Sequence, residues 1–273
     1  MEWELHLDPP RSAACNMAKD EHCLERARRS GRPALRLYAW ERLALSVGRA
    51  QQIGREIDVE ACRAAGVPLV RRITGGRAVL HGSDLTYSVT APTGLPGFGG
   101  GIMPIYRELS RVFVRFLTDL GCAPAVQTYT GRERLSLASA ICFATPSAFE
   151  ILIDGRKLVG SAQRLLPTAF LQHGSLPLAS QWDVLARLFR GASPAALREQ
   201  MTDLETLGVL QRHGEPALRE RLVAAFAEEL GVRFVPAHWD DADERAVQAL
   251  ESCYGAPDAA PLASAVAQMH AGD

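Results

Sequence analysis

Residues 141–176 read ICFATPSAFEILIDGRKLVGSAQRLLPTAFLQHGSL, and this stretch decides how the middle of the chain folds. Apolar side chains alternate from Phe149 to Ile153, directly before Asp154-Gly155. A two-residue Asp-Gly loop is among the strongest short-range signals for a β-hairpin, because both positions need a positive φ. We therefore expect a strand, a tight turn and a returning strand that begins near Lys157.

The returning part of this stretch contains a run of small side chains, Gly160-Ser161-Ala162, and it is followed by His173-Gly174. A glycine inside a strand often marks the close approach of a ligand or of another backbone, and it can equally mark a bulge. His173 has two interpretations, a general base or a core histidine whose ring is hydrogen-bonded. These residues are candidates for the wall of a substrate pocket.

Cys142 and Lys157 are the candidate chemical groups. Folding of the hairpin can bring them together, and a nearby ammonium group lowers the pKa of a thiol, whose thiolate is the nucleophile. The same ammonium can stabilise negative charge on a carbonyl oxygen under attack. Taken alone, Cys142 also fits a small buried hydrophobe and Lys157 a solvated residue at a strand edge. We expect Cys142 to be the nucleophile and Lys157 to support it electrostatically.

A second candidate region lies upstream, where a strand predicted over 67–74 leads into Gly75-Gly76. Arg71 and Arg72 are neighbours in this strand and therefore point to opposite faces. We expect one of them to reach an anionic carrier or a phosphate and the other to be a solvated charge. The glycine turn is expected to form a wall of the substrate pocket and to offer backbone N–H groups to the carbonyl oxygen under attack. His81 has the same two interpretations as His173.

The composition excludes several classes of protein. The 30 basic and 31 acidic residues nearly cancel, so no global field points to nucleic acid or to a membrane. Six cysteines occur without a C-x-x-C pair, which argues against a zinc ribbon or a thioredoxin-type site. The first 30 residues contain no apolar signal region, and no uncharged run is long enough for a membrane span. We expect a cytoplasmic protein with free thiols, no metal and no cofactor.

The remaining periodicities predict an α+β fold, because strands and helices are mixed in the first two thirds and helices alone follow. We expect one catalytic domain over residues 1–255, whose C-terminal part from about 193 is helical, and a frayed tail over 256–273. The glycine-rich run within 92–104 is expected to be a loop, since it does not open a helix after a parallel strand. The other expected helices cover 13–30, 58–65, 106–121, 216–230 and 242–252, and the other strands cover 35–40, 43–48, 78–80 and 85–90.

The two candidate regions resemble a known family. RRITGGRAVLHGSDLTYS (71–88) resembles the signature of the biotinyl/lipoyl protein ligase family. CFATPSAFEILIDGRKLVGSAQ (142–163) and LQHGS (171–175) are similar to its LipM-type octanoyltransferase branch. NMAKDE, LRLYAW and LSVGRAQ near the N-terminus also match, so that the resemblance covers roughly residues 13 to 255.

This resemblance implies a fold like class II biotin-synthetase catalytic domains, with a mixed, largely antiparallel sheet flanked by helices. It implies transfer of octanoyl from acyl carrier protein, through a cysteine thioester, to a lysine of a lipoyl-accepting protein such as the glycine cleavage H protein. The family's nucleophile falls on Cys142 and its lysine on Lys157. The substrate-contact candidates are Arg72, Gly75, Gly76, His81, Gly160, Ser161, Ala162, His173 and Gly174.

Three alternatives stay open within this resemblance. ATP-dependent lipoate or octanoate ligases usually carry three glycines where this chain has Gly75-Gly76-Arg77, and they lack the cysteine, so both departures favour a transferase without ATP. An amidotransferase that moves octanoyl between lipoyl domains is separated poorly by sequence. A non-catalytic acyl-binding module would bind the acyl group or its carrier without an acyl-cysteine. The Ala/Pro-rich segment after Cys253-Tyr254 departs from the family pattern, which leaves its role open.

Overall fold

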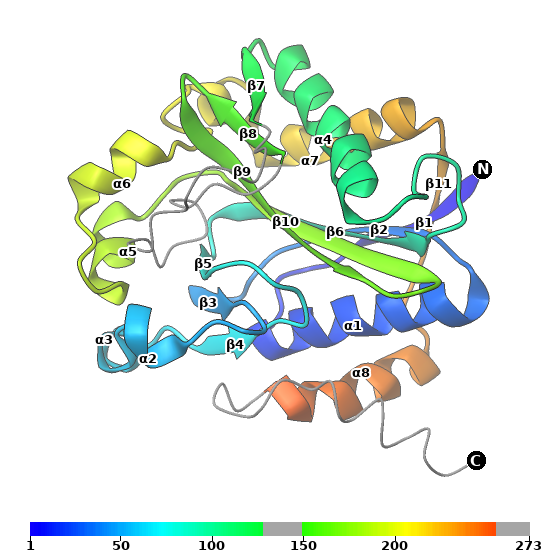
Figure 1. The fold of residues 1–273 in the computed structure, drawn as a ribbon, viewed down its shortest axis with the longest axis horizontal. Helices are drawn as coiled ribbons and strands as arrows, with labels where there is room; N and C mark the ends of the chain where they lie inside the picture. The colour runs from blue at the N-terminus through cyan, green and yellow to red at the C-terminus, as the bar shows by residue number, and fades with distance from the viewer. Residues whose placement is uncertain (128–148, 255–273) are drawn as a thin grey trace.

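The computed structural model describes residues 1–127 and 149–254, and its centre is a mixed eight-stranded sheet (Figure 1). The strand order is β11-β1-β2-β6-β10-β9-β8-β7. β1 runs parallel to both of its neighbours, and all other pairs are antiparallel. The expected α+β fold with a largely antiparallel sheet is therefore confirmed. The strands are β1 (Glu2–Leu7), β2 (Ala34–Tyr38), β6 (Asp84–Pro92), β7 (Pro124–Gln127), β8 (Glu150–Ile153), β9 (Arg156–Leu165), β10 (Ala169–Pro177) and β11 (Arg233–Pro236).

A smaller three-stranded sheet lies next to the large one, in the order β4-β3-β5 (Figure 1). Its strands are β3 (Ala44–Val47), β4 (Leu69–Arg71) and β5 (Val79–His81). Its apolar side chains share a hydrophobic cluster with the short helices of the same end of the molecule. The small sheet lies against one end of the large sheet, below β9 and β10 in the view of Figure 1.

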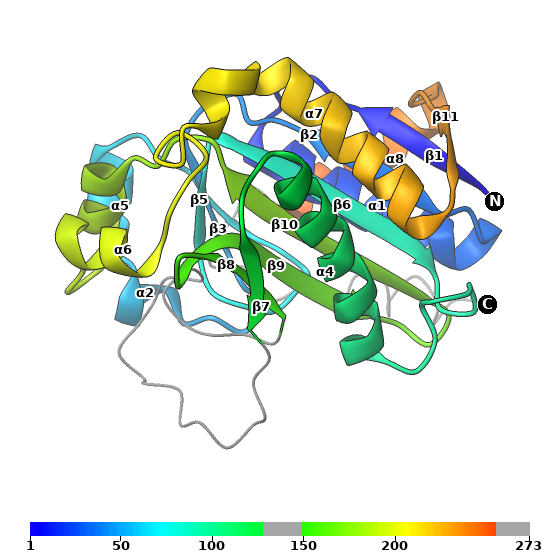
Figure 2. The same cartoon turned by 90° about the horizontal axis from the view of Figure 1, so that it is seen from above.

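Two helices cover one face of the large sheet, and a third helix covers the other. α4 and α7 lie side by side across β6, β10 and β9 (Figure 2), whereas α1 packs against the opposite face and α8 packs outside α1 (Figure 1). The large sheet is thus buried on both sides. The helices are α1 (Ala13–Ser30), α2 (Ile53–Glu56), α3 (Val59–Ala64), α4 (Ile102–Asp119), α5 (Trp182–Leu188), α6 (Pro194–Gln200), α7 (Val209–Leu230) and α8 (Asp241–Tyr254).

The alternation of β6 separates two kinds of interior. Leu85, Tyr87 and Val89 belong to the apolar cluster that the sheet forms with α4 and α7. The residues between them point to the other face, because successive side chains of a strand alternate. These are Asp84, Thr86, Ser88 and Thr90, and all four are buried. One face of the sheet is therefore a hydrophobic core, and the other is a buried polar face.

The polar face is held by charges on α1 and β2. Arg36 is fully buried, and its guanidinium donates to Asp8 Oδ2 at 2.6 Å, to Asp20 Oδ1 at 2.8 Å and to Asn16 Oδ1 at 2.7 Å. Buried charges need partners of this kind, since desolvation alone would expel them from the interior. Asn16 and Asp20 both belong to the NMAKDE segment, which therefore contributes to the buried centre of the protein.

Several elements follow from local signals, as predicted. The predicted turn is present, with φ of 50° at Asp154 and 75° at Gly155. The helix expected over 13–30 has these bounds, ends at a left-handed Gly31, and begins with Ser12 Oγ accepting from the Cys15 N–H. Asp58 caps α3 as expected, by accepting from the Ala61 N–H.

Other expectations were wrong in extent. The strand expected over 67–74 is limited to Leu69–Arg71, because the chain turns toward Gly75 soon afterwards. The helix expected from Tyr106 begins at Ile102, and the helix expected from Pro216 begins at Val209 and kinks at Gly214. β1, β7, β11, α2 and α5 were not predicted. The expected tail, 256–273, lies outside the described residues.

Among the described helices, none combines the length and the apolar character that a membrane span requires.

Candidate active site

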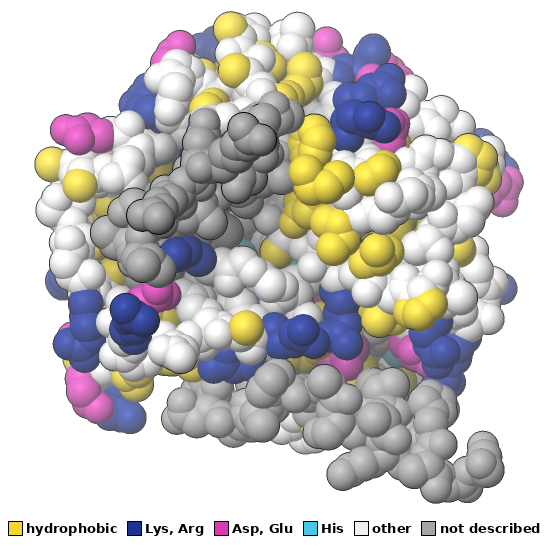
Figure 3. All heavy atoms as spheres, viewed as in Figure 1, with side chains coloured by type: hydrophobic (Ala, Val, Ile, Leu, Met, Phe, Trp, Pro, Cys, Tyr) yellow, Lys and Arg dark blue, Asp and Glu magenta, His cyan; other side chains and the backbone are white. Residues whose placement is uncertain are grey.

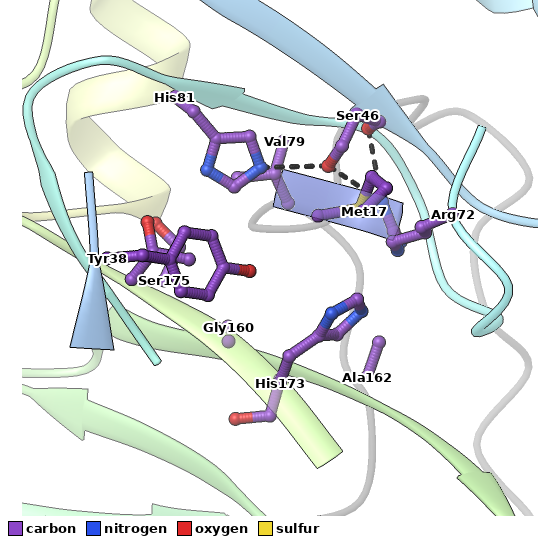
Figure 4. A pocket seen from close by; sticks show the side chains of 13 residues that line it. Met17, Tyr38, Ser46, Arg72, Val79, His81, Gly160, Ala162, His173 and Ser175 are labelled. Atoms are coloured by element: carbon purple, nitrogen blue, oxygen red, sulfur yellow. Dashed lines mark hydrogen bonds between the residues drawn. The ribbon is translucent and has the colours of Figure 1, made fainter. Parts of the chain in front are cut away.

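A cavity opens on the polar face, where β9 and β10 pass over the three-stranded sheet (Figure 4). Water-sized spheres can occupy about 30 Å³ of it, and the roughly 330 Å³ of empty space along its lining includes open solvent. Its walls come from α1, from both sheets and from the small-residue run of β9. The lining residues are Met17, Tyr38, Ser46, Arg72, Val79, His81, Thr86, Gly160, Ser161, Ala162, His173, Gly174 and Ser175. The structure therefore brings seven of the nine substrate-contact candidates to one cavity, namely Arg72, His81, Gly160, Ser161, Ala162, His173 and Gly174.

Gly75 and Gly76, the other two candidates, do not line this cavity. Their turn lies behind Arg72, whose Nη2 donates to the Gly75 carbonyl at 2.8 Å. A Cβ atom at Gly48 would lie 1.9 Å from the Gly76 carbonyl oxygen, so the turn packs directly on the backbone of residue 48. In the described structure, the glycine turn positions Arg72 and does not form a wall of the cavity.

Gly174 of β10 has its explanation in the close approach of the β9 backbone and of Tyr87. Gly174 pairs with Ser161 in the ladder between β10 and β9. A Cβ atom at Gly174 would lie 2.5 Å from the Gly160 carbonyl oxygen and 2.6 Å from Cε1 of Tyr87. No side chain fits there, because real Cβ contacts are never so short. The bulge lies elsewhere, where the register of β8 and β9 shifts between Ile151 and Leu152.

His173 has a partner at each ring nitrogen. Its Nδ1 lies 2.8 Å from Asp20 Oδ2, and its Nε2 lies 2.7 Å from Thr74 Oγ1. Burial alone would raise the pKa of Asp20, but the hydrogen bond from His173 and the charge of Arg36 outweigh it and lower that pKa. Asp20 is therefore ionised and can only accept, so Nδ1 carries the proton and Nε2 accepts from Thr74. Burial lowers the pKa of His173, although Asp20 opposes this shift.

His81 has the same arrangement on the opposite wall (Figure 4). Its Nδ1 lies 2.8 Å from Asp84 Oδ2, and its Nε2 lies 2.8 Å from Ser46 Oγ. Burial would raise the pKa of Asp84, but His81 and hydrogen bonds from the Gly82 N–H and Ser175 outweigh it and lower that pKa. By the same reasoning, Nδ1 donates to Asp84, and the Ser46 hydroxyl donates to Nε2. The ring is stacked on Trp40, with centroids 4.0 Å apart.

Arg72 joins the two histidine systems. Its Nη1 donates to Ser46 Oγ at 3.1 Å, and its Nε donates to Thr74 Oγ1 at 3.1 Å. One guanidinium thus touches both hydroxyls, and it carries a fixed positive charge because an arginine is not deprotonated in proteins. The expectation that one of Arg71 and Arg72 is a solvated charge was wrong, because Arg72 is buried and Arg71 is half-buried, with its Nη1 donating to the carbonyls of Gly48, Arg49 and Gln51.

Lys157 is buried, with 2% of its surface exposed, and it forms an ion pair with Glu150 across the hairpin. The alternative of a solvated lysine at a strand edge is therefore wrong. Its carbonyl accepts from the Thr202 N–H at 3.0 Å, which ties β9 to the segment after α6. Cys142 lies outside the described residues, so the pairing of Cys142 with Lys157 stays a prediction from the sequence.

Five polar residues of this region were missed by the sequence analysis: Asp20, Ser46, Thr74, Asp84 and Glu150. Pairing of β3 with β5 brings Ser46 to His81, which no local pattern displays. Thr74 reaches His173 from the bend after β4, and Asp84 lies only three residues after His81. Two signals were nevertheless present. Hydroxyl residues alternate along β6 within a strongly apolar context, and opposite charges stand in the two strands of a predicted hairpin.

Basic side chains gather over α2 and β4 in the space-filling view (Figure 3). Arg55 of α2 and Arg49 are exposed, and Arg71 of β4 is half-buried. This positive surface lies on the part of the chain that also carries Arg72. An anionic partner would be attracted to this side of the molecule.

Comparison with known proteins places the chain among enzymes of protein lipoylation. The model of the lipoyl protein ligase A/B catalytic domain matches residues 12–227. The chain is 40% identical over 244 residues to octanoyltransferase LipM of Kyrpidia tusciae, covering 86% of this chain and 89% of that protein. It is 39% identical to octanoyltransferase LipM of Moorella thermoacetica, covering 89% and 92%.

Solved structures show the same fold at lower identity. Lipoate-protein ligase A bound with ATP superposes with a TM-score of 0.75 at 22% identity, covering 92% of this chain and 95% of that one. The bipartite lipoate protein ligase of Thermoplasma acidophilum gives 0.76 at 20% identity, covering 96% of each chain. These two likenesses establish the architecture alone.

Proposed function

The chain belongs to the lipoyl protein ligase A/B catalytic domain family, and from this premise we infer that it is an octanoyltransferase of lipoate biosynthesis. The observation that carries this inference is the 40% identity to octanoyltransferase LipM across 86% of the chain. Such an enzyme needs an acyl donor and a lipoyl-accepting protein. We place the activity in one catalytic domain over residues 1–255, in the cytoplasm.

The finer proposal concerns the route of the acyl group. Octanoyl passes from acyl carrier protein to Cys142 and then to a lysine of the acceptor, for example the glycine cleavage H protein. The thioester donor is already activated, exchange between two sulfurs is nearly isoenergetic, and the amide formed at the end is much more stable. ATP is therefore not required. A covalent intermediate divides one transfer between two large proteins into two separate steps.

The cavity supports this proposal by its shape and chemistry. Gly160 and Ala162 leave room beside the apolar side chains of Met17 and Val79. Burial of an octanoyl chain contributes about 0.8 kcal/mol per methylene group. The buried guanidinium of Arg72 on the same wall offers a positive charge near which negative charge can develop on a carbonyl oxygen.

The test is intact-mass analysis after mixing the protein with octanoyl-carrier protein without ATP. We expect an octanoyl adduct on the wild-type protein and on Cys122→Ala, whose half-buried thiol is the matched control, and none on Cys142→Ala. An adduct that persists in Cys142→Ala contradicts the nucleophile. If modification of the acceptor needs free octanoate and ATP, the protein is a ligase. If it prefers an octanoylated lipoyl domain as donor, it is an amidotransferase. Binding of the acyl group or carrier without any adduct indicates a non-catalytic binding module.

Lys157 needs a variant that preserves the fold. Lys157→Ala would remove the cation that pairs with the buried Glu150 carboxylate and cost about 3–5 kcal/mol of stability. The double variant Lys157→Met with Glu150→Gln removes both charges and retains much of the volume. We expect it to slow single-turnover acylation by about 10²–10³-fold, which is the effect of losing one stabilising donor. Acylation at the wild-type rate in a folded double variant would remove Lys157 from the mechanism.

A further inference from the structure

The amine of an acceptor lysine must lose a proton during transfer, and the cavity wall offers few groups that can take it. Among the described lining residues, Tyr38, Arg72, His81 and His173 are titratable. Arg72 keeps its protons, and the Tyr38 hydroxyl already donates to Asp20 at 2.9 Å. The two histidines remain. Each is held by a carboxylate and contacts one hydroxyl, so each resembles a hydroxyl–imidazole–carboxylate relay.

The two relays differ in their access to the cavity. Ser46, which contacts His81, lines the cavity, whereas Thr74, which contacts His173, does not. Arg72 donates to both hydroxyls at 3.1 Å, so the electrostatic setting at the two hydroxyls is closely matched. A substrate amine in the cavity can therefore reach Ser46 but not Thr74.

The direction of the hydrogen bonds at His81 suits proton acceptance. Asp84 Oδ2 accepts from His81 Nδ1 at 2.8 Å, from Thr86 Oγ1 at 2.8 Å and from Ser175 Oγ at 2.7 Å. These bonds fix the carboxylate and the imidazole tautomer. Nε2 is then left as the acceptor of the Ser46 hydroxyl proton. A proton that arrives at Ser46 Oγ can displace the hydroxyl proton toward His81 without any movement of heavy atoms.

We propose that Ser46, backed by His81 and Asp84, accepts the proton of the acceptor lysine when its amine attacks the octanoyl thioester. This rests on the proposed octanoyl transfer to lysine. The lysine reacts as its neutral amine, after its ammonium group has given one proton to solvent. The amine nitrogen then forms a bond to the carbonyl carbon, and the carbon–sulfur bond breaks. The nitrogen gives one proton to Ser46 Oγ while the hydroxyl proton of Ser46 moves to His81 Nε2. The departing sulfur takes a proton back by the same path, so that Ser46 and His81 return to their initial states.

In this scheme Ser46 touches the substrate amine, and His81 and Asp84 are positioning residues that act through it. The effect of removing the Ser46 hydroxyl should therefore depend on which nucleophile attacks and not on the acyl group that is transferred. A lysine amine needs a proton acceptor, whereas hydroxylamine is largely unprotonated at neutral pH and attacks thioesters with little help from a base.

The experiment compares these two nucleophiles with the same octanoyl donor, after subtraction of the rate without protein. We expect Ser46→Ala to slow transfer to the lysine of the acceptor protein by about 10²-fold while hydroxamate formation changes much less. Thr74→Val removes the corresponding hydroxyl from the other relay and is the matched control. It should leave the ratio of the two rates at the wild-type value.

Two further variants separate chemistry from structure. Ser46→Thr retains a hydroxyl and should restore most of the lysine rate. Asp84→Asn leaves the size of the side chain but removes the charge that fixes the tautomer of His81, so it should change the ratio in the same direction as Ser46→Ala. Equal losses with both nucleophiles in Ser46→Ala, or an equal change of ratio in Thr74→Val, would overturn the relay.

The ratio is measured on total product, so it tests the relay whether or not an acyl-protein accumulates. Failure of the proposed covalent route is seen separately, as an absent octanoyl adduct on the wild-type protein. An unchanged ratio in Ser46→Ala together with a clear wild-type adduct would overturn the relay and leave the proposed function standing.

Discussion

The two faces of the large sheet differ in what they bury. On the side of α4 and α7, Phe113, Phe226 and Tyr87 belong to a continuous apolar cluster, whereas on the side of α1 the strands bury the polar side chains of Arg36, His173 and Asp84. The apolar side gains stability from area removed from water, which does not depend on direction. The polar side gains stability only if every charge meets its partner. The cavity opens on the polar side, where hydrogen bonds fix the position of each side chain.

The apolar face therefore mainly stabilises the fold, and the polar face positions the reactive groups. Apolar packing tolerates changes that conserve volume, because it has no directional requirement. The buried charges form one connected system from Asp8 through Arg36 and Asp20 to His173, so a change at one member reaches the others. A sheet with one face of each kind has a stable support directly behind its reactive groups.

The largest expected effect comes from removing the cation of the polar face. Arg36→Met leaves Asp8 and Asp20 buried without their guanidinium, and we expect it to lower the free energy of unfolding by about 3–5 kcal/mol at neutral pH. Urea unfolding measures this loss. Phe226→Ala is the counterpart on the apolar face, and a large-to-small change there costs about 3–5 kcal/mol.

Similar losses at neutral pH do not by themselves distinguish the two faces. If Arg36→Met proves nearly neutral while Phe226→Ala is costly, the charges of the polar face are dispensable for stability. The contrast drawn between the faces would then be wrong.

The pH dependence of these two losses is the second prediction. Burial alone would raise the pKa values of Asp8 and Asp20, but Arg36 and the neighbouring hydrogen-bond donors lower them. Their stabilising effect is therefore present above the unfolded pKa near 3.9 and is lost as the pH falls through the folded values. Without Arg36, burial dominates, both carboxyls take up protons at a higher pH, and protonation relieves the penalty.

The deficit of Arg36→Met should therefore shrink between pH 7 and about pH 4, whereas the deficit of Phe226→Ala should stay constant. Urea unfolding at several pH values compares the two. A deficit of Arg36→Met that is independent of pH would show that the cost arises from lost packing and not from unpaired carboxylates.

The elements that the sequence predicted well are those whose signals are local. The Asp154-Gly155 turn, the Ser12 and Asp58 caps and the Gly31 stop each act within a few residues, so the pattern carries the whole cause. β1 and β11 were missed because their pairing joins the two ends of the described chain. β1 (EWELHL) alternates polar and apolar residues, so its signal was present in the sequence, whereas the four residues of β11 (RFVP) show no alternation.

The site was predicted in part for a related reason. The seven substrate-contact candidates that line the cavity could be found from the sequence, because small residues within a strand and histidines stand out there. Ser46 does not stand out, since its role arises only when β3 pairs with β5 beside His81, whereas Asp84 lies three residues after His81 and was a local signal that went unused. Lys157 was recognised, but its burial with Glu150 depends on which face of the hairpin is covered, and one strand does not reveal this.

The smallest expected change in the free energy of unfolding comes from removing one hydroxyl oxygen on each face of the sheet. Tyr38 and Tyr87 are both buried, but the Tyr38 hydroxyl donates to ionised Asp20 at 2.9 Å, whereas the Tyr87 hydroxyl lies 2.8 Å from Ser161 Oγ and accepts a long bond from Gln172 Nε2 at 3.3 Å. A hydrogen bond to a charged group is worth about 1.5–3 kcal/mol, and one between neutral groups about 0.5–1.5 kcal/mol. We therefore expect Tyr38→Phe to destabilise the protein more than Tyr87→Phe, as measured by urea unfolding at neutral pH. The two changes delete the same oxygen and open similar space, so equal losses would mean that the charge of Asp20 adds nothing to the bond and that the two faces differ in composition but not in energetics.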